Sequence, residues 1–171
     1  MIKDIFKIND FVAIYTDLEA ETFGLGMVVA FDDKDVIIGS VDPSGNEDGL
    51  ILYNVDTICK IEKDTQYCQK IKKLMQSKKT SLATHGFGKK ILQELLSLAK
   101  DNKKLVEIQL QNSHKSDTVG FVESLDNNVC KIRQFDYLGN EDGCCIFLIE
   151  DISSVKYDNR ESKDTLLLMD L

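Results

Sequence analysis

Short apolar runs separated by polar turns fill the first third of the chain and predict β-strands. The turn segments are rich in Asp, Gly, Ser and Asn, and the only proline, Pro43, opens one of them. Such runs are typical of short strands joined by tight connections. The predicted strands are residues 11–15, 26–31, 36–41, 50–55 and 58–61. Five short strands in about fifty residues predict a small curled sheet or barrel.

After Asp64 the apolar spacing changes to that of a helix. Tyr67, Ile71, Leu74 and Met75 recur three or four residues apart, which places them on one helical face. The Asp64 carboxylate can cap such a helix at its first turn. We expect the apolar stripe of this helix to lie across the open end of the barrel and to stabilise it.

The whole pattern recurs at an offset of 94 residues without a gap. The segment 45–49, Gly-Asn-Glu-Asp-Gly, returns unchanged as residues 139–143. Such self-similarity predicts a duplicated domain. In the second copy the predicted strands are residues 105–110, 119–125, 129–135, 144–149 and 152–155, and the predicted terminal helix is 158–169.

The segment between the copies is basic. Residues 79–104 carry 6 Lys/Arg against 2 Asp/Glu, and apolar residues at helical spacing predict a helix over 87–100. Its apolar surface is wide, which favours packing between the two copies or at a dimer contact. The predicted organisation is a first barrel plus helix over 1–78, a basic linker and connecting helix over 79–102, and a second barrel plus helix over 103–171.

Charge restricts the partners that fit this chain. The net charge is −8, and both predicted barrels are acidic, which disfavours phosphate backbones. We therefore expect a protein partner, leave nucleic acid and a homodimer open, and expect no membrane. No apolar run approaches the ~18 residues of a membrane span or follows a basic start as in a secretory signal, so a cytoplasmic location is predicted.

Side chains suited to catalysis or metal binding form no recognisable motif. The five cysteines include no C-x-x-C pair, and the only histidines are His85 and His114. Oxygen-bearing residues alternate through the first copy of the repeated turn as in a calcium loop, but Glu47 stands where that loop needs glycine. We predict hairpin turns, leave a weak cation site open, and predict no cofactor and no enzymatic activity.

Each copy resembles the small Sm-like or SH3-like barrel. Gly26 is followed by Phe31 and Asp32, and Gly120 is followed by Leu125 and Asp126, as in the first Sm motif. The resemblance implies two tandem five-stranded barrels, each followed by a helix and joined by a helical connector. The chain is also similar in general appearance to cytoplasmic proteins of Gram-positive bacteria.

The RNA site of the Sm family does not carry over with the motif. The asparagine that helps to hold an RNA base in that family is replaced by Val36 and Cys130. A fold alone does not specify a function. The sequence therefore predicts a non-enzymatic binding or scaffolding protein that acts through its barrels, with an Sm-like RNA-binding regulator as the alternative. An enzyme with a site between the barrels is the third hypothesis. The candidate partner contacts are the strand aromatics Tyr53 and Phe147 and the linker residues Lys89 and Lys90.

Overall fold

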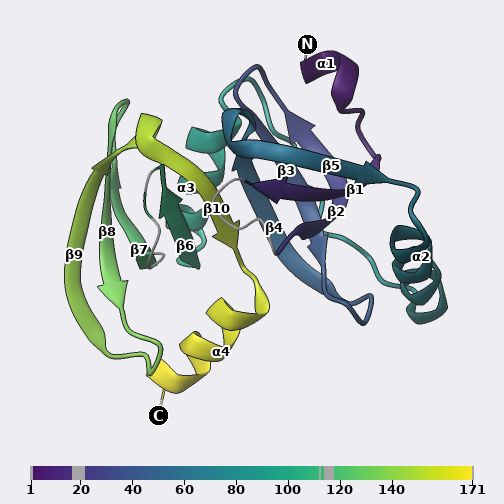
Figure 1. Cartoon of the computed structure of the whole chain (residues 1–171). Coiled ribbons are helices and arrows are strands. Elements are labelled where there is room, and N and C mark those ends of the chain that lie inside the picture. Colours follow the sequence, from purple (N-terminus) through teal and green to yellow (C-terminus); the bar gives the residue numbers. More distant parts are fainter. Residues whose placement is uncertain (1, 17–21, 112, 114–117, 171) are drawn as a thin grey trace. The chain divides into compact units, whose positions relative to one another are not determined.

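The computed structural model describes residues 2–16, 22–111, 113 and 118–170 (Figure 1). His114 lies outside the described residues. The chain divides into two compact units, Met1–Ile91 (unit 1) and Leu92–Leu171 (unit 2). None of the described helices is both long enough and apolar enough to cross a membrane.

Unit 1 is a curled antiparallel sheet with a helix on its outer face. The hydrogen-bonded strand order is β5-β1-β2-β3-β4. A 3-10 turn, η1, leads from β4 into β5, and Asn54 caps it by accepting a hydrogen bond from the Asp56 amide. The elements are α1 (Ile2–Ile5), β1 (Phe11–Thr16), β2 (Gly24–Phe31), β3 (Asp35–Val41), β4 (Glu47–Asn54), η1 (Val55–Thr57), β5 (Ile58–Lys63) and α2 (Gln66–Lys78).

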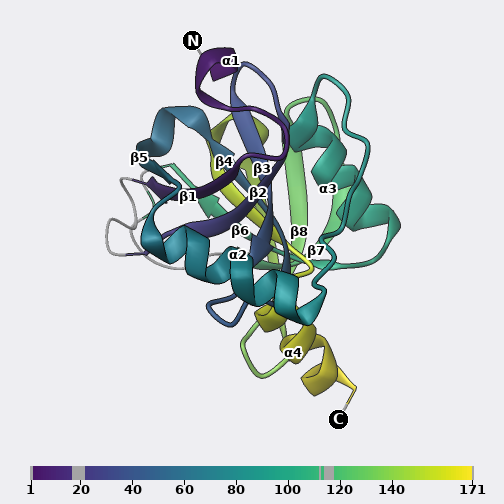
Figure 2. The same cartoon turned by 90° about the vertical axis from the view of Figure 1, so that its right-hand side faces the viewer.

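Alternation along the strands of unit 1 divides its core into two clusters. Side chains of one parity fill the inside of the curl, and those of the other parity pack against α2, which Figure 2 shows in front of β1 and β2. The inner cluster is Phe6, Val12, Ile14, Val28, Val36, Ile38, Ile51 and Tyr53. The outer cluster is Phe11, Ala13, Leu25, Val41, Cys68, Ile71 and Met75.

Helix α2 differs from the prediction in its cap and in its position. Thr65, and not Asp64, caps it by accepting a hydrogen bond from the Cys68 amide at 3.2 Å. Asp64 has a left-handed φ of 56° and instead forms an ion pair of 3.5 Å with Lys72. The apolar stripe lies on the outer face of the sheet, because Ile71 belongs to the outer cluster.

Unit 2 repeats the elements of unit 1 at the offset of 94 residues. Its strand order is β10-β6-β7-β8-β9, and every strand has the bounds of its counterpart plus the offset. Left-handed backbone recurs too, as at Gly45 and Gly139. The elements are α3 (Ile91–Asp101), β6 (Leu105–Leu110), β7 (Thr118–Leu125), β8 (Val129–Phe135), β9 (Glu141–Leu148), η2 (Ile149–Asp151), β10 (Ile152–Tyr157) and α4 (Arg160–Met169).

The predicted fold class was wrong in one respect: the sheet is open. The ten described strands belong to a single antiparallel sheet, and not to two closed five-stranded barrels joined by a helical connector. In unit 1 β5 turns away from β4 to pair with β1, and in unit 2 β10 pairs with β6. Alternation shows which side chains share a face, but it is the same in open and closed sheets, so it could not reveal whether the edges meet.

The predicted connecting helix starts later than expected. Residues 80–88 adopt neither helix nor strand, and α3 begins at Ile91. The Ile91 amide donates to Oδ2 of Asp32 at 3.4 Å, so a carboxylate distant in sequence marks the start of the helix. From Leu92 onward α3 belongs to unit 2, where Asn102 beyond its end donates to the Tyr157 hydroxyl at 3.1 Å.

Candidate functional site

The four candidate contacts predicted from sequence lie in different surroundings. Tyr53 and Phe147 hold equivalent positions in the two units, and each ring is buried, with 8% of the residue exposed. The Tyr53 hydroxyl packs so close to Gly24 that a Cβ there would overlap it. Lys89 and Lys90 are exposed residues before α3. Their contact with a partner stays a prediction.

The repeated acidic segments form hairpin turns that are closed by an aspartate. Oδ1 of Asp42 accepts from the amides of Ser44 at 2.8 Å and Asn46 at 2.9 Å, while Oδ2 accepts from Asn46 Nδ2 at 2.8 Å. Asp136 makes the same bonds to Asn140 in unit 2. Burial acts to raise the pKa of Asp42, but the hydrogen bonds from Asn46 and Ser44 and the charge of Lys78 together lower it. These carboxylates hold the turns, and cation binding by them stays a prediction.

The described residues contain no group of three or more His, Cys, Asp or Glu side chains that could hold a metal ion. The buried thiol of Cys130 is equally unsuited to chemistry. Burial, with a smaller effect of Cys145, raises its pKa to about 11, so the thiolate is scarce at neutral pH.

An arginine lies over two phenylalanine rings on the outer face of unit 2. The guanidinium carbon of Arg133 is 5.6 Å from the ring centroid of Phe121 and 5.5 Å from that of Phe135. The two rings meet edge to face, with centroids 5.5 Å apart. Arg133 is exposed, and it is paired with Phe121 in the register of β7 and β8. A cation held over aromatic rings combines apolar area with charge at one place.

Strand β9 continues this face with exposed apolar side chains. Cys144, Ile146 and Leu148 point away from the core, with Ile146 63% and Leu148 44% exposed, whereas Phe147 between them is buried. Cys144 is paired in register with Arg133 on β8. We call Phe121, Arg133, Phe135, Cys144, Ile146 and Leu148 the outer face of unit 2.

Strand β9 is also the last strand of the sheet, beside β8 in Figure 1. In an antiparallel pair, half of the backbone N–H and C=O groups of an edge strand point away from its neighbour. Charged side chains or a covering segment normally protect such an edge. The charged residues of β9 are Glu141 and Asp142 at its start, and residues 143–148 carry no charged side chain, so charge protects one end of this edge and not the rest.

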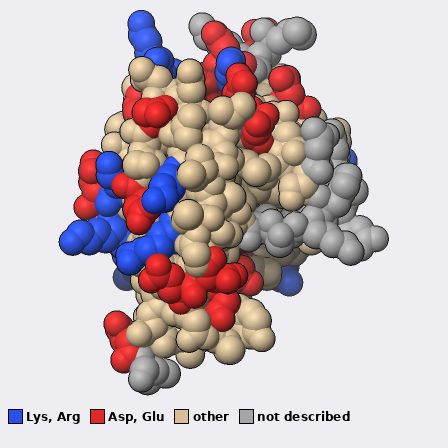
Figure 3. All heavy atoms as spheres, turned by 90° about the vertical axis from the view of Figure 1, so that its left-hand side faces the viewer, with Lys and Arg blue, Asp and Glu red and all other residues tan. Residues whose placement is uncertain are grey.

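Charges border the apolar stretch of β9 on several sides. Glu141 and Asp142 precede it and Glu150 and Asp151 follow it, and all four are exposed. On β8 the ammonium of Lys131 lies 2.6 Å from Glu123. Figure 3 views this side and shows a broad uncharged area with Asp and Glu side chains above and below it.

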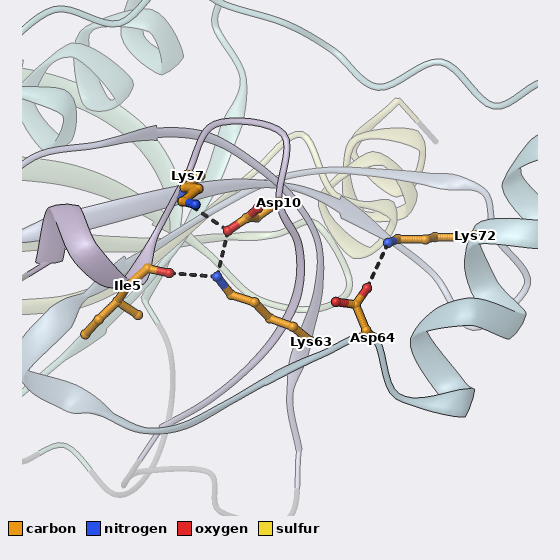
Figure 4. Close-up of polar contacts among 6 residues, drawn as sticks. All are labelled: Ile5, Lys7, Asp10, Lys63, Asp64 and Lys72. Atoms are coloured by element: carbon orange, nitrogen blue, oxygen red, sulfur yellow. Dashed lines mark hydrogen bonds and ion pairs between the residues drawn. The ribbon is translucent and has the colours of Figure 1, made fainter.

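The edge strand at the other end of the sheet, β5, carries charged side chains that form hydrogen bonds and ion pairs. Lys63 donates from Nζ to the Ile5 carbonyl at 2.7 Å and to Asp10 Oδ2 at 2.6 Å, as Figure 4 shows. The bond from Lys63 lowers the pKa of Asp10. Lys60 and Glu62 form a further ion pair of 2.8 Å on the same strand. The N-terminal segment is thereby fastened to β5, so the two edges differ in chemistry.

The same face is covered in unit 1. Gly39 stands where unit 2 has Arg133, and a Cβ there would contact Leu82 at 3.4 Å. Leu82 comes from the segment after α2 and packs on the outer cluster. Leu50 and Leu52, the counterparts of Cys144 and Ile146, are 1% and 0% exposed. Among the described residues, these positions are therefore covered in unit 1, whereas their counterparts Arg133, Cys144 and Ile146 are exposed in unit 2.

The residues of the outer face of unit 2 were not predicted from the sequence. The offset of 94 residues carried a signal for Arg133, since it aligns this charge with Gly39 on a predicted strand. The sequence held no signal that Ile146 is exposed, because an apolar run over 144–149 is typical of a strand that is buried on both faces. The structure places Ile146 on the edge strand β9 with 63% of the residue exposed.

Comparison of the chain with protein-family models, with curated proteins and with solved structures found no match.

Proposed function

We propose that the chain is a non-enzymatic binding protein that engages a protein partner through the outer face of unit 2. The observation that carries this proposal is an edge strand whose residues 143–148 are uncharged, with exposed Cys144, Ile146 and Leu148. Burying such side chains against a partner is favourable by roughly 25 cal/mol per Å² of apolar area. Exposed apolar patches with a polar rim are typical of interaction sites.

The residues beside β9 support the same proposal. Arg133, Phe121 and Phe135 form one packed group, and aromatic and arginine side chains are enriched among those that dominate protein interfaces. The rings already hold the guanidinium in place, so a partner carboxylate or carbonyl would meet a partly ordered donor. Anchors of this kind need little further ordering on binding.

Retention of a partner by the immobilised full-length chain tests the proposal. The bait is the wild-type chain, its Ile146→Lys variant or its Ile8→Lys variant, each exposed to lysate of the source cells with and without nuclease. Ile8 is 52% exposed in unit 1, so the control adds the same charge elsewhere. We expect a protein retained by wild type and Ile8→Lys, regardless of nuclease, and lost with Ile146→Lys. Equal retention by all three baits, or by none, would contradict the proposal.

A second candidate partner is single-stranded RNA, which the packing of Arg133 on Phe121 and Phe135 favours. Bases stack on aromatic rings and on arginine planes of open sheets. The exposed carboxylates of Glu141 and Asp142 and the net charge of −8 oppose it, since they repel a phosphate backbone. Retention that disappears with nuclease, weakens steeply with salt and fails with Arg133→Ala would establish RNA instead of protein.

Internal duplication is part of this proposal. Coincident strand bounds at the offset of 94 residues support it, as do the matching turn bonds of Asp42 and Asp136. In the proposed division, unit 1 keeps Gly39, Leu50 and Leu52 covered, and unit 2 uses the equivalent positions for binding. Free cysteines throughout the described residues favour the cytoplasmic location that we also propose.

A further inference from the structure

We infer that the partner contributes an extended segment that joins β9 as an additional strand, with apolar residues over Ile146 and basic residues at both ends. This inference rests on the proposed function and specifies its partner. It follows from the backbone of the edge, the side chains of its exposed face and the charges at its two ends.

The backbone of β9 favours a strand as the occupant. Its paired neighbour in the described sheet is β8, with a register from Val129 opposite Leu148 to Phe135 opposite Glu141. The outward-pointing amides and carbonyls of this edge can be satisfied in regular order by an extended segment. A helix laid on the same edge would leave those groups without matching partners.

The side chains of β9 specify alternate apolar positions in the added segment. Cys144, Ile146 and Leu148 lie on one face at a spacing of two residues, the period of a strand. Directly opposed side chains on neighbouring antiparallel strands lie about 4.5–5.5 Å apart at Cβ and contact one another. A segment with β-branched or aliphatic residues at every second position therefore matches this face.

The charges beside β9 indicate which residues should flank the apolar stretch of the added segment. The exposed Glu141 and Asp142 stand at one end of β9, and the exposed Glu150 and Asp151 follow its other end. An added strand that spans residues 143–148 brings its own two ends beside these carboxylates. Lysine or arginine at both ends complements them, whereas acidic ends are repelled.

The same charges disfavour a second copy of this chain as the occupant. In an antiparallel pairing of two β9 strands, the Glu141 and Asp142 end of one copy meets the Glu150 and Asp151 end of the other. Two parallel β9 strands place like ends together. Both arrangements bring carboxylates beside carboxylates, so the partner segment belongs to a different and more basic protein.

Selection from a phage-displayed library of random linear peptides, with the full-length chain as target, tests the inference. Selected peptides are synthesised, and their affinity is measured by fluorescence anisotropy for wild type, Ile146→Lys, Ile8→Lys and the double variant Glu141→Gln with Glu150→Gln. We expect alternating aliphatic residues between lysines or arginines, with affinity at least tenfold weaker for Ile146→Lys and severalfold weaker for the double variant. Ile8→Lys should bind as wild type does.

A proline at an alternate position of the selected peptide checks the backbone pairing, because proline cannot donate a ladder hydrogen bond. Loss of binding is expected. The inference is overturned if no peptide is enriched, if enriched peptides lack basic ends, or if proline is tolerated. It is also overturned if light scattering shows a dimer that Ile146→Lys dissociates, since a second copy then covers β9. Retention of a lysate protein that still depends on Ile146 would leave the proposed function standing.

Discussion

Gly39 in unit 1 and Arg133 in unit 2 hold the same place in the strand register, but Leu82 covers the first and the second faces solvent. Gly39 is paired with Met27 across β2 and β3, and Arg133 with Phe121 across β7 and β8. A Cβ on Gly39 would already touch Leu82 at 3.4 Å. Glycine at this position therefore accompanies the covered face of unit 1, and arginine accompanies the exposed face of unit 2.

Exchanging the residue at this position should affect the two units differently. The side chain of Gly39→Arg would have to displace Leu82, which a Cβ would already contact, so we expect a loss of about 1–3 kcal/mol in the free energy of unfolding. Arg133→Ala removes an exposed side chain from Phe121 and Phe135, and we expect a loss of about 1 kcal/mol or less. Urea denaturation of both variants measures the difference. Equal losses would show that Leu82 does not close this face of unit 1.

The buried carboxyl of Asp35 should make stability depend on pH. Asp35 is 5% exposed, and its Oδ1 has no hydrogen-bond partner among the described residues. Burial, with a smaller repulsion from Asp32, raises its pKa from 3.8 to about 7. Between these two values the unfolded chain is ionised at this group and the folded chain is protonated. The free energy of unfolding should therefore fall as pH rises from about 4 to 7, by up to about 4 kcal/mol, and this contribution is constant above 7.

Asp35→Asn removes this dependence, since an amide does not ionise. We expect the variant to be more stable than wild type at pH 8 and to lose the contribution of this group to the decline between pH 4 and 7. Urea denaturation at pH 4, 6 and 8 gives the comparison, with Asp33→Asn, an exposed neighbour, as the control. A wild-type and variant difference that does not change with pH would show that Asp35 is ionised throughout.

Glycine in the repeated turns should be required for two separate reasons. Gly45 and Gly139 have φ of 81° and 84°, and a Cβ would lie 2.8 Å from Leu74 Cβ and 2.9 Å from the Met169 amide nitrogen. Alanine at either position therefore meets both backbone strain and a helix. We expect losses of about 2–4 kcal/mol in the free energy of unfolding.

Two other glycines separate these effects. Gly143 has a φ of 75° with open space around it, so its alanine variant should lose only about 1 kcal/mol from backbone strain. Gly86 has open space and no positive φ, so its alanine variant should match wild type. In thermal unfolding, the alanine variants of Gly45 and Gly139 should be the least stable, that of Gly143 intermediate and Gly86→Ala the most stable. A Gly139→Ala variant as stable as Gly86→Ala would refute the packing of α4 on the turn.

Local pattern was sufficient to predict most strands of this chain. The predicted strand over 36–41 is β3 (Asp35–Val41), because alternation and flanking turn residues are encoded within a few positions. The start of α3 was wrongly predicted at residue 87 and lies at Ile91, since the group that meets its first amide is Asp32, distant in sequence. The prediction of closed barrels was wrong for the same reason. Whether edge strands pair depends on hydrogen bonds between residues that are distant in sequence.

Less of the candidate site than of the fold could be predicted from the sequence. Tyr53 and Phe147 were expected to contact a partner because aromatic residues on strands suit a groove, but both rings are buried. Ile146 belongs to an apolar run that is typical of a central strand, and only the strand order places it at an edge. Arg133 was detectable in principle, because its charge replaces a glycine at the offset of the repeat.

Thiol labelling should map binding at β9 without any substitution. Cys144 and Cys59 are exposed and Cys130 is buried with a raised pKa, so a maleimide should label the first two quickly and Cys130 only after unfolding. A selected peptide bound along β9 should slow labelling of Cys144 at least fivefold and leave Cys59 on β5 unchanged. Mass spectrometry of the digested protein reports both sites from one sample, so Cys59 is an internal control. Equal slowing at both cysteines, or at neither, would place the peptide elsewhere and contradict strand addition at this edge.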